Sequence, residues 1–242
     1  YARGKKTNLT LKTTSMEAIN QTTSQIISQL QKEKKTTPGA IGSQGKVKFK
    51  QIFQMEANKL VQRNNSAKKF TIDSSNIEVI NALLAYFTGQ QVSGIELTKG
   101  ILLSGPVGVG KSLMLKAFAN TLRHYQKAFS FVACQDIVFE YETTGQMDKY
   151  TANQAGYSGK PAKFCFDEIG RETIPAVHFG NRRNVMQHIL AYRYNYWQNN
   201  GLITHGTTNA TPQELVSLYG EHIGDRIREM FNWIPVDGNS RR

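Results

Sequence analysis

The segment GPVGVGKS, residues 105–112, combines glycines, a lysine and a serine at a spacing that can hold phosphate groups. It follows an apolar run and opens a stretch with the apolar periodicity of a helix. Glycines let backbone N–H groups turn inward around phosphate oxygens, beside the positive end of that helix. Lys111 would reach the β- and γ-phosphates, and Ser112 would ligate Mg²⁺. The segment predicts a nucleotide site, a P-loop, formed by Gly105, Pro106, Val107, Gly108, Val109, Gly110, Lys111, Ser112 and Leu113.

A pair of carboxylates, Asp167 and Glu168, directly follows a later apolar run, residues 164–166. A carboxylate at a strand end can hold Mg²⁺ through its water shell, so we assign Asp167, with Ser112, to the metal. Its neighbour Glu168 can polarise the water that attacks the γ-phosphate. The adjacent pair favours hydrolysis over phosphoryl transfer to a small molecule, because such a transfer needs no water-activating glutamate.

A third polar residue at a strand end is Asn209, which follows the apolar run at residues 202–207. Its amide can hydrogen-bond both the γ-phosphate and the attacking water, although asparagine also caps many turns. Ligands of open α/β sheets bind at the carboxyl ends of the strands. We therefore expect Asn209 to act at the same sheet edge as Lys111 and Asp167.

Five short apolar runs alternate with helical patterns, at residues 100–104, 129–133, 164–167, 202–207 and 231–236. This alternation predicts an α/β fold, a P-loop NTPase with a five-stranded, mostly parallel sheet covered on both faces. Two helices are predicted before it, over residues 46–63 and 75–89, from apolar residues at helical spacing. Ser75 and Glu78 have capping-box spacing at the start of the second helix.

The composition of the first 46 residues predicts a loosely ordered basic arm. They hold half of the net charge of +12, contain few aromatic residues and end in the breaker-rich run TTPGAIGSQG. One amphipathic helix is expected inside the arm, because Met16, Ile19, Thr23, Ile26 and Leu30 follow the narrow stripe of a helix that docks on another helix. The stripe could equally cover the protein's own core. We divide the chain into this arm (1–46), a helical part (47–94) and an ATPase domain (95–242).

Composition also indicates the cellular compartment of the protein. No apolar run approaches the ~18 residues that a membrane span needs, so no membrane partner is expected. Cys134 and Cys165 match no metal-ligand spacing and read as buried free thiols in a reducing compartment. These features predict a cytoplasmic protein.

The P-loop, the acidic pair and Asn209, together with the segments YGEHIGDRIREMFNW and NSRR, resemble AAA+ ATPases. Within them the chain is similar to DnaC/DnaI-type loaders of the replicative DNA helicase and to IstB-type transposition ATPases, over residues 95–242. The resemblance implies ATP and Mg²⁺ as cofactors, slow hydrolysis stimulated by DNA or a partner, and a homo-oligomer. In that family an N-terminal extension contacts the helicase, which by position alone points to residues 1–60.

The resemblance also gives roles to arginines near the C-terminus. Most AAA+ modules carry a helical lid with a sensor arginine after the fifth strand, and this chain has no room there for a full lid. Arg241 or Arg242 would then sense the γ-phosphate. Arg226 lies where family members place the arginine that reaches into a neighbour's site. The loaders commonly have arginine where this chain has His222, so either Arg226 substitutes for it or the helix register differs.

Three functions remain open from the sequence: a replicative helicase loader, a transposition-targeting ATPase that oligomerises on duplex DNA, and a nucleotide-dependent adaptor with negligible turnover. A single-stranded DNA surface is plausible, since lysine and arginine suit phosphates and tyrosine suits base stacking. The candidates are Lys149, Tyr150, Tyr157, Lys160, Arg182 and Arg183. The same residues would also suit an ordinary solvated loop.

Overall fold

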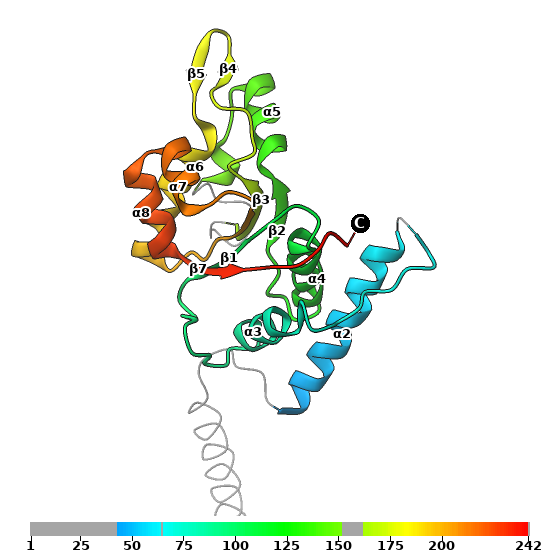
Figure 1. Ribbon diagram of the computed structural model, residues 1–242. Coiled ribbons are helices and arrows are strands. Elements are labelled where there is room, and N and C mark those ends of the chain that lie inside the picture. The colour runs from blue at the N-terminus through cyan, green and yellow to red at the C-terminus, as the bar shows by residue number, and fades with distance from the viewer. Residues whose placement is uncertain (1–42, 64, 152–161, 242) are drawn as a thin grey trace, which may run out of the picture. The chain divides into compact units, whose positions relative to one another are not determined.

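Five parallel strands form the central sheet, in the order β2-β3-β6-β1-β7. Their bounds are β1 (Gly100–Ser104), β2 (Ser130–Ala133), β3 (Phe164–Ile169), β6 (His205–Thr208) and β7 (Phe231–Pro235). The computed structural model describes residues 43–63, 65–151 and 162–241 (Figure 1). The helix predicted at residues 16–30 therefore lies outside the described residues. The α/β class and the parallel five-stranded sheet are confirmed.

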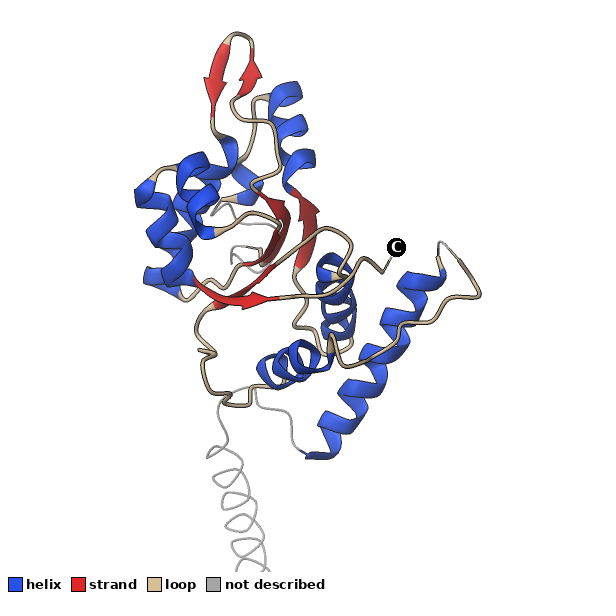
Figure 2. Ribbon diagram, in the orientation of Figure 1, coloured by secondary structure: helices blue, strands red, loops and turns tan. Residues whose placement is uncertain are grey.

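Helices cover both faces of this sheet. They are α2 (Ser43–Gln62), α3 (Ile77–Phe87), α4 (Lys111–Arg123), α5 (Cys134–Thr144), α6 (Val185–Asn200), α7 (Pro212–Tyr219) and α8 (Glu221–Met230). Figures 1 and 2 show α2, α3 and α4 on one side of the sheet and α6, α7 and α8 on the other. Among the described helices, none is long and apolar enough to cross a bilayer.

The helix α2 packs on α4 through aromatic side chains. Phe49 and Phe53 are fully buried, and their ring centres lie 6.3 Å and 4.3 Å from that of Phe118. The predicted helical part after the arm thus belongs to the same compact unit as the sheet, which spans Gly42–Arg242. Buried aromatic area of this kind is what keeps α2 in place on the domain.

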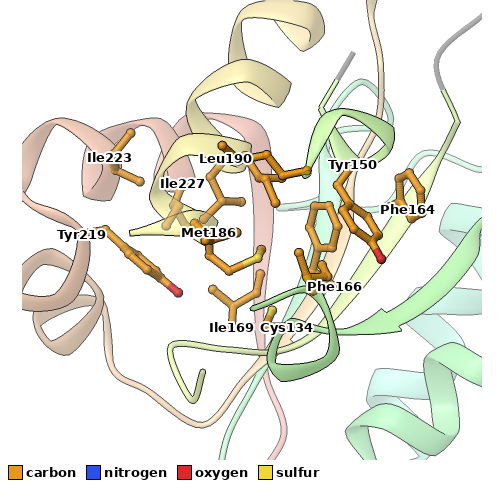
Figure 3. Close-up of a cluster of buried hydrophobic side chains, with 14 of the residues drawn as sticks. Cys134, Tyr150, Phe164, Phe166, Ile169, Met186, Leu190, Tyr219, Ile223 and Ile227 are labelled. Atoms are coloured by element: carbon orange, nitrogen blue, oxygen red, sulfur yellow. The ribbon is translucent and has the colours of Figure 1, made fainter. Parts of the chain in front are cut away.

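The opposite face holds an apolar cluster in which α5, α6, α7 and α8 meet β3 (Figure 3). Phe166, Met186 and Ile227 lie in it, each with 2% exposure or less. Cys134 belongs to the same cluster, and both cysteines are free and buried, as predicted. This cluster fixes the end of β3 against α7 and α8, and that end carries the acidic pair.

Two helix starts differ in their agreement with the sequence. The capping box predicted for Ser75 and Glu78 is wrong, because the N-cap of α3 is Asn76 and its side chain makes no cap hydrogen bond. Ser75 Oγ instead donates to Asp73 at 2.8 Å. The helix α7 does begin with a capping box, in which Thr211 is the N-cap residue, and Pro212 is its first residue.

A two-stranded antiparallel hairpin, absent from the predicted elements, follows β3. It consists of β4 (Ala176–His178) and β5 (Asn181–Arg183), and Figure 1 shows it projecting away from the sheet. Phe179 and Gly180 form its tip, with φ angles of 44° and 80°. Runs of three residues are too short to give a periodic apolar signal, which is why the sequence pattern did not indicate them.

Candidate nucleotide-binding site

The P-loop turns from β1 into α4, and its glycines adopt left-handed backbone. Gly108 and Gly110 have φ angles of 91° and 101°, which residues with a Cβ rarely adopt. The helix α4 begins immediately after Gly110, so its positive end faces the loop. Backbone N–H groups at a helix start bind phosphate well. The segment therefore has the local geometry of a phosphate cradle.

Lys111 lies at the start of α4 and is 6% exposed. Its Nζ donates to the carbonyl oxygens of Gly105 at 2.6 Å and Pro106 at 2.7 Å, and to Oδ1 of Asn209 at 2.7 Å. Burial lowers the pKa of Lys111, while two nearby carboxylates act in the opposite direction. Neutral oxygens hold the ammonium, so its charge remains available to a phosphate that enters the loop.

Ser112 and Asp167 meet although they lie on different elements. Ser112 Oγ donates to Oδ1 of Asp167 at 2.6 Å, and Thr207 Oγ1 donates to the same oxygen at 2.6 Å. Hydroxyl and carboxylate oxygens at a nucleotide site are the protein ligands that Mg²⁺ takes. The predicted pair of metal ligands is thus together. The sequence prediction missed Thr207. Its position at the end of a strand, close to Asn209 in the sequence, is the feature that could have indicated a place in the site.

β3 is irregular at its acidic pair. Its register with β6 shifts between Phe166 and Ile169, and Glu168 has a φ of 59°, in the left-handed region. Side chains of a regular strand alternate between two faces, whereas a bulge re-aims one of them. Asp167 contacts the start of α4, and Glu168 lines the same cavity as Lys111. The irregular backbone lets two adjacent carboxylates serve one site.

Asn209 contributes an unsatisfied donor to this site. Its Oδ1 accepts from Lys111, but its Nδ2 is buried without a hydrogen-bond partner among the described residues. Leaving a buried donor unpaired costs about 1–3 kcal/mol. A phosphate oxygen beside Lys111 would supply the missing acceptor. The orphaned amide, the ammonium and the Ser112–Asp167 oxygens together fit a magnesium–nucleotide complex.

One cavity of about 570 Å³ is lined by Lys111, Ser112, Glu168 and Asn209, and its volume suits a nucleotide-sized ligand. One wall is the connector between α2 and α3, with Lys68, Lys69, Phe70, Thr71 and Asp73. Side chains of α2 hold that connector: Gln54 Nε2 donates to the Phe70 carbonyl, and the Phe70 N–H donates to Asn58 Oδ1, both at 2.8 Å. The sequence prediction missed this wall, because the connector follows no recognisable motif.

The segment after β7 runs across the P-loop, and Figure 1 shows it ending near the start of α4. The N–H of Val236 donates to the Ser104 carbonyl at 2.7 Å, and the N–H of Arg241 donates to the Gly108 carbonyl at 3.0 Å. A Cβ on Gly105 would collide with the backbone of Val236, so this glycine also makes room for the crossing segment. No helix follows β7 among the described residues.

Arg241 reaches the rim of the cavity. Its guanidinium pairs with Asp73 Oδ1 at 2.7 Å and also donates to Ser75 Oγ. The hydrogen bond from Arg241 is the main reason that the pKa of Asp73 falls to about 2. The position suits the predicted γ-phosphate sensor, but the guanidinium is engaged by Asp73 here. Arg242, the other predicted sensor, lies outside the described residues.

Arg226 lies on α8, half-buried, with its guanidinium 5.0 Å from the ring centre of Tyr194. His222 is exposed on the same helix. No carboxylate forms an ion pair with Arg226 within the described part of the chain. A role in a neighbour's site needs a second subunit, so it stays a prediction.

Four of the candidate DNA residues, Lys149, Tyr150, Arg182 and Arg183, lie in the part of the chain that the structure describes. Tyr150 is 4% exposed and donates its hydroxyl to Glu140 at 2.6 Å, so the base-stacking prediction for Tyr150 is wrong. Its ring packs against Phe164 instead, at 5.5 Å between ring centres. Lys149 pairs with Glu140 at 2.6 Å. Arg182 and Arg183 are exposed on β5, and Tyr157 and Lys160 lie outside the described residues.

The sheet order, the P-loop between β1 and α4 and the acidic pair at the end of β3 define a P-loop NTPase fold. The model of the ATPase family associated with various cellular activities (AAA) matches residues 101–230, more than half of the chain. The chain belongs to this AAA family of ATPases. Its predicted resemblance to AAA+ ATPases is confirmed.

Curated relatives include ATP-dependent zinc metalloproteases FtsH. That of Mesomycoplasma conjunctivae is 29% identical over 171 residues, which cover 66% of this chain and 22% of the relative. That of Mycoplasmopsis pulmonis is 30% identical over 155 residues, covering 60% of this chain and 21% of the relative. The chain thus spans about a fifth of the length of these relatives.

Solved structures share the fold at low identity. The crystal structure of DnaI has a TM-score of 0.51 and 22% identity, over 73% of this chain and 89% of that chain. A candidate primosome component of Streptococcus pyogenes serotype M3 has a TM-score of 0.50 and 21% identity, over 70% and 84%. The predicted likeness to the DnaC/DnaI type is therefore confirmed at the level of the fold.

Proposed function

We propose that this chain binds ATP with Mg²⁺, hydrolyses it, and uses the cycle to load or remodel a replicative DNA helicase on DNA. The observation that carries the ATPase proposal is the convergence of Lys111, Ser112 and the orphaned Asn209 amide on one cavity, with Asp167 hydrogen-bonded to Ser112. Three separate elements supply these groups. A nucleotide with its magnesium ion is the ligand that explains why a cation, metal ligands and an unsatisfied donor lie together.

Each residue then has a defined task. Lys111 and the P-loop N–H groups stabilise charge on the β- and γ-phosphates. Ser112 and Asp167 hold Mg²⁺, which neutralises phosphate charge when bound. Glu168 accepts a proton from the attacking water, or orients that water, from its re-aimed position. Asn209 donates its free amide hydrogen to the γ-phosphate, and Lys111 keeps that amide in place through Oδ1.

Replacing Lys111 with alanine tests the nucleotide site. The variant removes the ammonium that bonds Asn209 and that would bind phosphate, so ATP affinity should fall by about 10- to 100-fold, in line with the removal of a charged hydrogen bond to phosphate. Binding is measured with a fluorescent ATP analogue and turnover by phosphate release with Mg²⁺ or with EDTA. Arg123→Ala, on the exposed end of α4, is the matched control for removal of one cation. Equal affinity in wild type and Lys111→Ala would remove the basis of the proposal.

The helicase is the partner that the fold and the arm favour. DnaI shares the fold, and the basic arm before residue 46 has the position at which such loaders extend toward the helicase. A chain that starts at Lys46 should still bind ATP but fail to capture a replicative helicase that the whole chain captures. Capture by both chains would assign the arm another role. No turnover under any condition, with ATP still bound, would favour the adaptor.

Single-stranded DNA is the polymer we propose for the exposed hairpin β4–β5. Phe179 lies at its tip and is 92% exposed. Its φ of 44° is strained for a residue with a Cβ. Arg182 and Arg183 lie beside it, and residues 173–213 contain no aspartate or glutamate. An exposed ring for bases and two cations for phosphates suit a single strand.

Variants of this hairpin test the DNA proposal. Phe179→Ala should weaken binding to a single-stranded oligonucleotide by about 1–3 kcal/mol, the usual cost of removing one stacking side chain. Replacing Arg182 and Arg183 with alanine should reduce the slope of log affinity against log salt by about 0.7 for each phosphate that the variant no longer neutralises. Arg123→Ala again serves as the control cation. Unchanged affinity in both hairpin variants would rule the hairpin out, and preference for duplex DNA would favour the transposition-targeting ATPase.

A further inference from the structure

The left-handed backbone at Glu168 is held by a set of specific hydrogen bonds. The N–H of Glu168 donates to Thr207 Oγ1 at 2.9 Å, and its carbonyl accepts from the N–H of Arg171 at 3.0 Å. The Ile169 carbonyl accepts from Thr208 Oγ1 at 2.7 Å. Such a conformation costs of order 1–3 kcal/mol and persists only where the surroundings over-determine it. The surrounding hydrogen bonds therefore fix the conformation of the turn after Glu168.

Glu172 supplies a further bond to this turn from inside the protein. It is 6% exposed, and its Oε2 accepts from the N–H of Gly170 at 3.0 Å. Its Oε1 accepts from the hydroxyl of Tyr219 at 2.5 Å. Burial raises the pKa of Glu172, and no lysine or arginine pairs with it among the described residues. Burying a carboxylate without a cation costs free energy, so hydrophobic packing alone does not explain why a glutamate occupies this position.

The partner of Glu172 lies at a junction. Tyr219 is the last residue of α7, is 1% exposed, and is followed by Gly220, which caps α8. Figure 3 shows Tyr219 extending from that junction toward Ile169 and Met186. The helix α8 also carries Arg226 and His222. The chain of bonds Tyr219–Glu172–Gly170 therefore connects the α7–α8 junction to the turn that sets the direction of Glu168.

We propose that Glu172 is a positioning residue for Glu168, and that the Tyr219–Glu172–Gly170 chain links the position of α7 and α8 to the rate of ATP hydrolysis. The inference rests on the proposed ATPase function, because Glu168 matters only if water attacks a bound nucleotide. Glu172 itself is not one of the residues that line the cavity. Its effect is exerted through the backbone of the Glu168 turn.

Three single variants of the full chain separate positioning from folding. Glu172→Ala removes both bonds, and a displacement of about 1 Å at a catalytic group can lower kcat by about 100-fold. Glu172→Gln keeps an acceptor for Gly170 and can donate its amide to the Tyr219 oxygen, so it should retain most of the activity. Tyr219→Phe removes only the hydroxyl and should lower kcat less than Glu172→Ala. In all three variants the KM for ATP and the affinity for a non-hydrolysable analogue should stay near the wild-type values.

A double variant decides whether the effect passes through Glu168. In a Glu168→Gln background, measured by single-turnover phosphate release, adding Glu172→Ala should cause little further loss of rate, because the positioned group is already gone. Rate losses that multiply, or a Glu172→Ala chain with wild-type kcat, would overturn the positioning role while leaving the ATPase proposal intact. A wild-type chain that binds ATP without hydrolysing it would overturn both. Circular dichroism melting of each variant identifies any that fail to fold. If Glu172→Ala is among them, Tyr219→Phe carries the test, alone and in the Glu168→Gln background, and wild-type kcat in Tyr219→Phe would then overturn the positioning role.

Discussion

Glu168→Gln protein is expected to bind ATP and Mg²⁺ as tightly as the wild type and to hydrolyse ATP about 10²–10⁴ times more slowly, the range that general base catalysis contributes. The amide is nearly the same size as the carboxylate but cannot accept a proton from water. Glu168 has a left-handed backbone conformation and lines the cavity. Its own main-chain N–H and carbonyl make the hydrogen bonds to Thr207 Oγ1 and from the Arg171 N–H, so these bonds survive the change of side chain. The variant should therefore keep its fold and its nucleotide.

The measurement is phosphate release at saturating ATP, together with titration of a fluorescent ATP analogue. Glu78→Gln, an exposed carboxylate in the first turn of α3, is the matched control and should behave as wild type. Lys111→Ala provides the opposite phenotype, in which ATP binding itself fails. If Glu168→Gln hydrolyses ATP at the wild-type rate, another group activates the water and Glu168 must be removed from the mechanism.

Arg226→Ala is expected to show the largest loss of rate in the chain, about 10³–10⁵, if its guanidinium completes the site of a neighbouring subunit. An arginine that stabilises transition-state charge is worth that much, whereas a surface arginine contributes little. In one subunit its guanidinium stacks on Tyr194, where it has no carboxylate partner among the described residues. ATP binding should be normal, because the P-loop of the same subunit is unchanged.

Mixed subunits test this prediction directly. Arg226→Ala has an intact P-loop, and Lys111→Ala has an intact Arg226, so a mixture should recover part of the activity that neither variant has alone. Two different surfaces must meet for this to happen, and such heterologous contacts build rings or open spirals. His222→Ala is the control for the alternative helix register. A mixture that stays inactive, while both variants still oligomerise, would show that Arg226 is not the trans group.

The sequence by itself determined the parts of the site whose geometry is local. The P-loop is one run of consecutive residues at the turn from β1 into α4, and its glycines specify the left-handed backbone wherever the rest of the chain lies. Asp167, Glu168 and Asn209 could be assigned because parallel strands deliver their carboxyl ends to one edge. Alternating apolar runs were enough to predict that sheet.

Only the tertiary structure decided which distant groups meet. Thr207 joins Ser112 at Asp167, the connector before α3 forms one wall of the cavity, and Arg241 pairs with Asp73. Tyr150, an exposed base-stacking residue by its sequence context, is buried against Phe164. Glu172 resembles an ordinary surface carboxylate in the sequence, and only the structure shows its hydrogen bond with Tyr219. A motif encodes the backbone torsions of its own few residues, whereas burial and hydrogen-bond partners depend on packing between segments far apart in the chain, which no local pattern records.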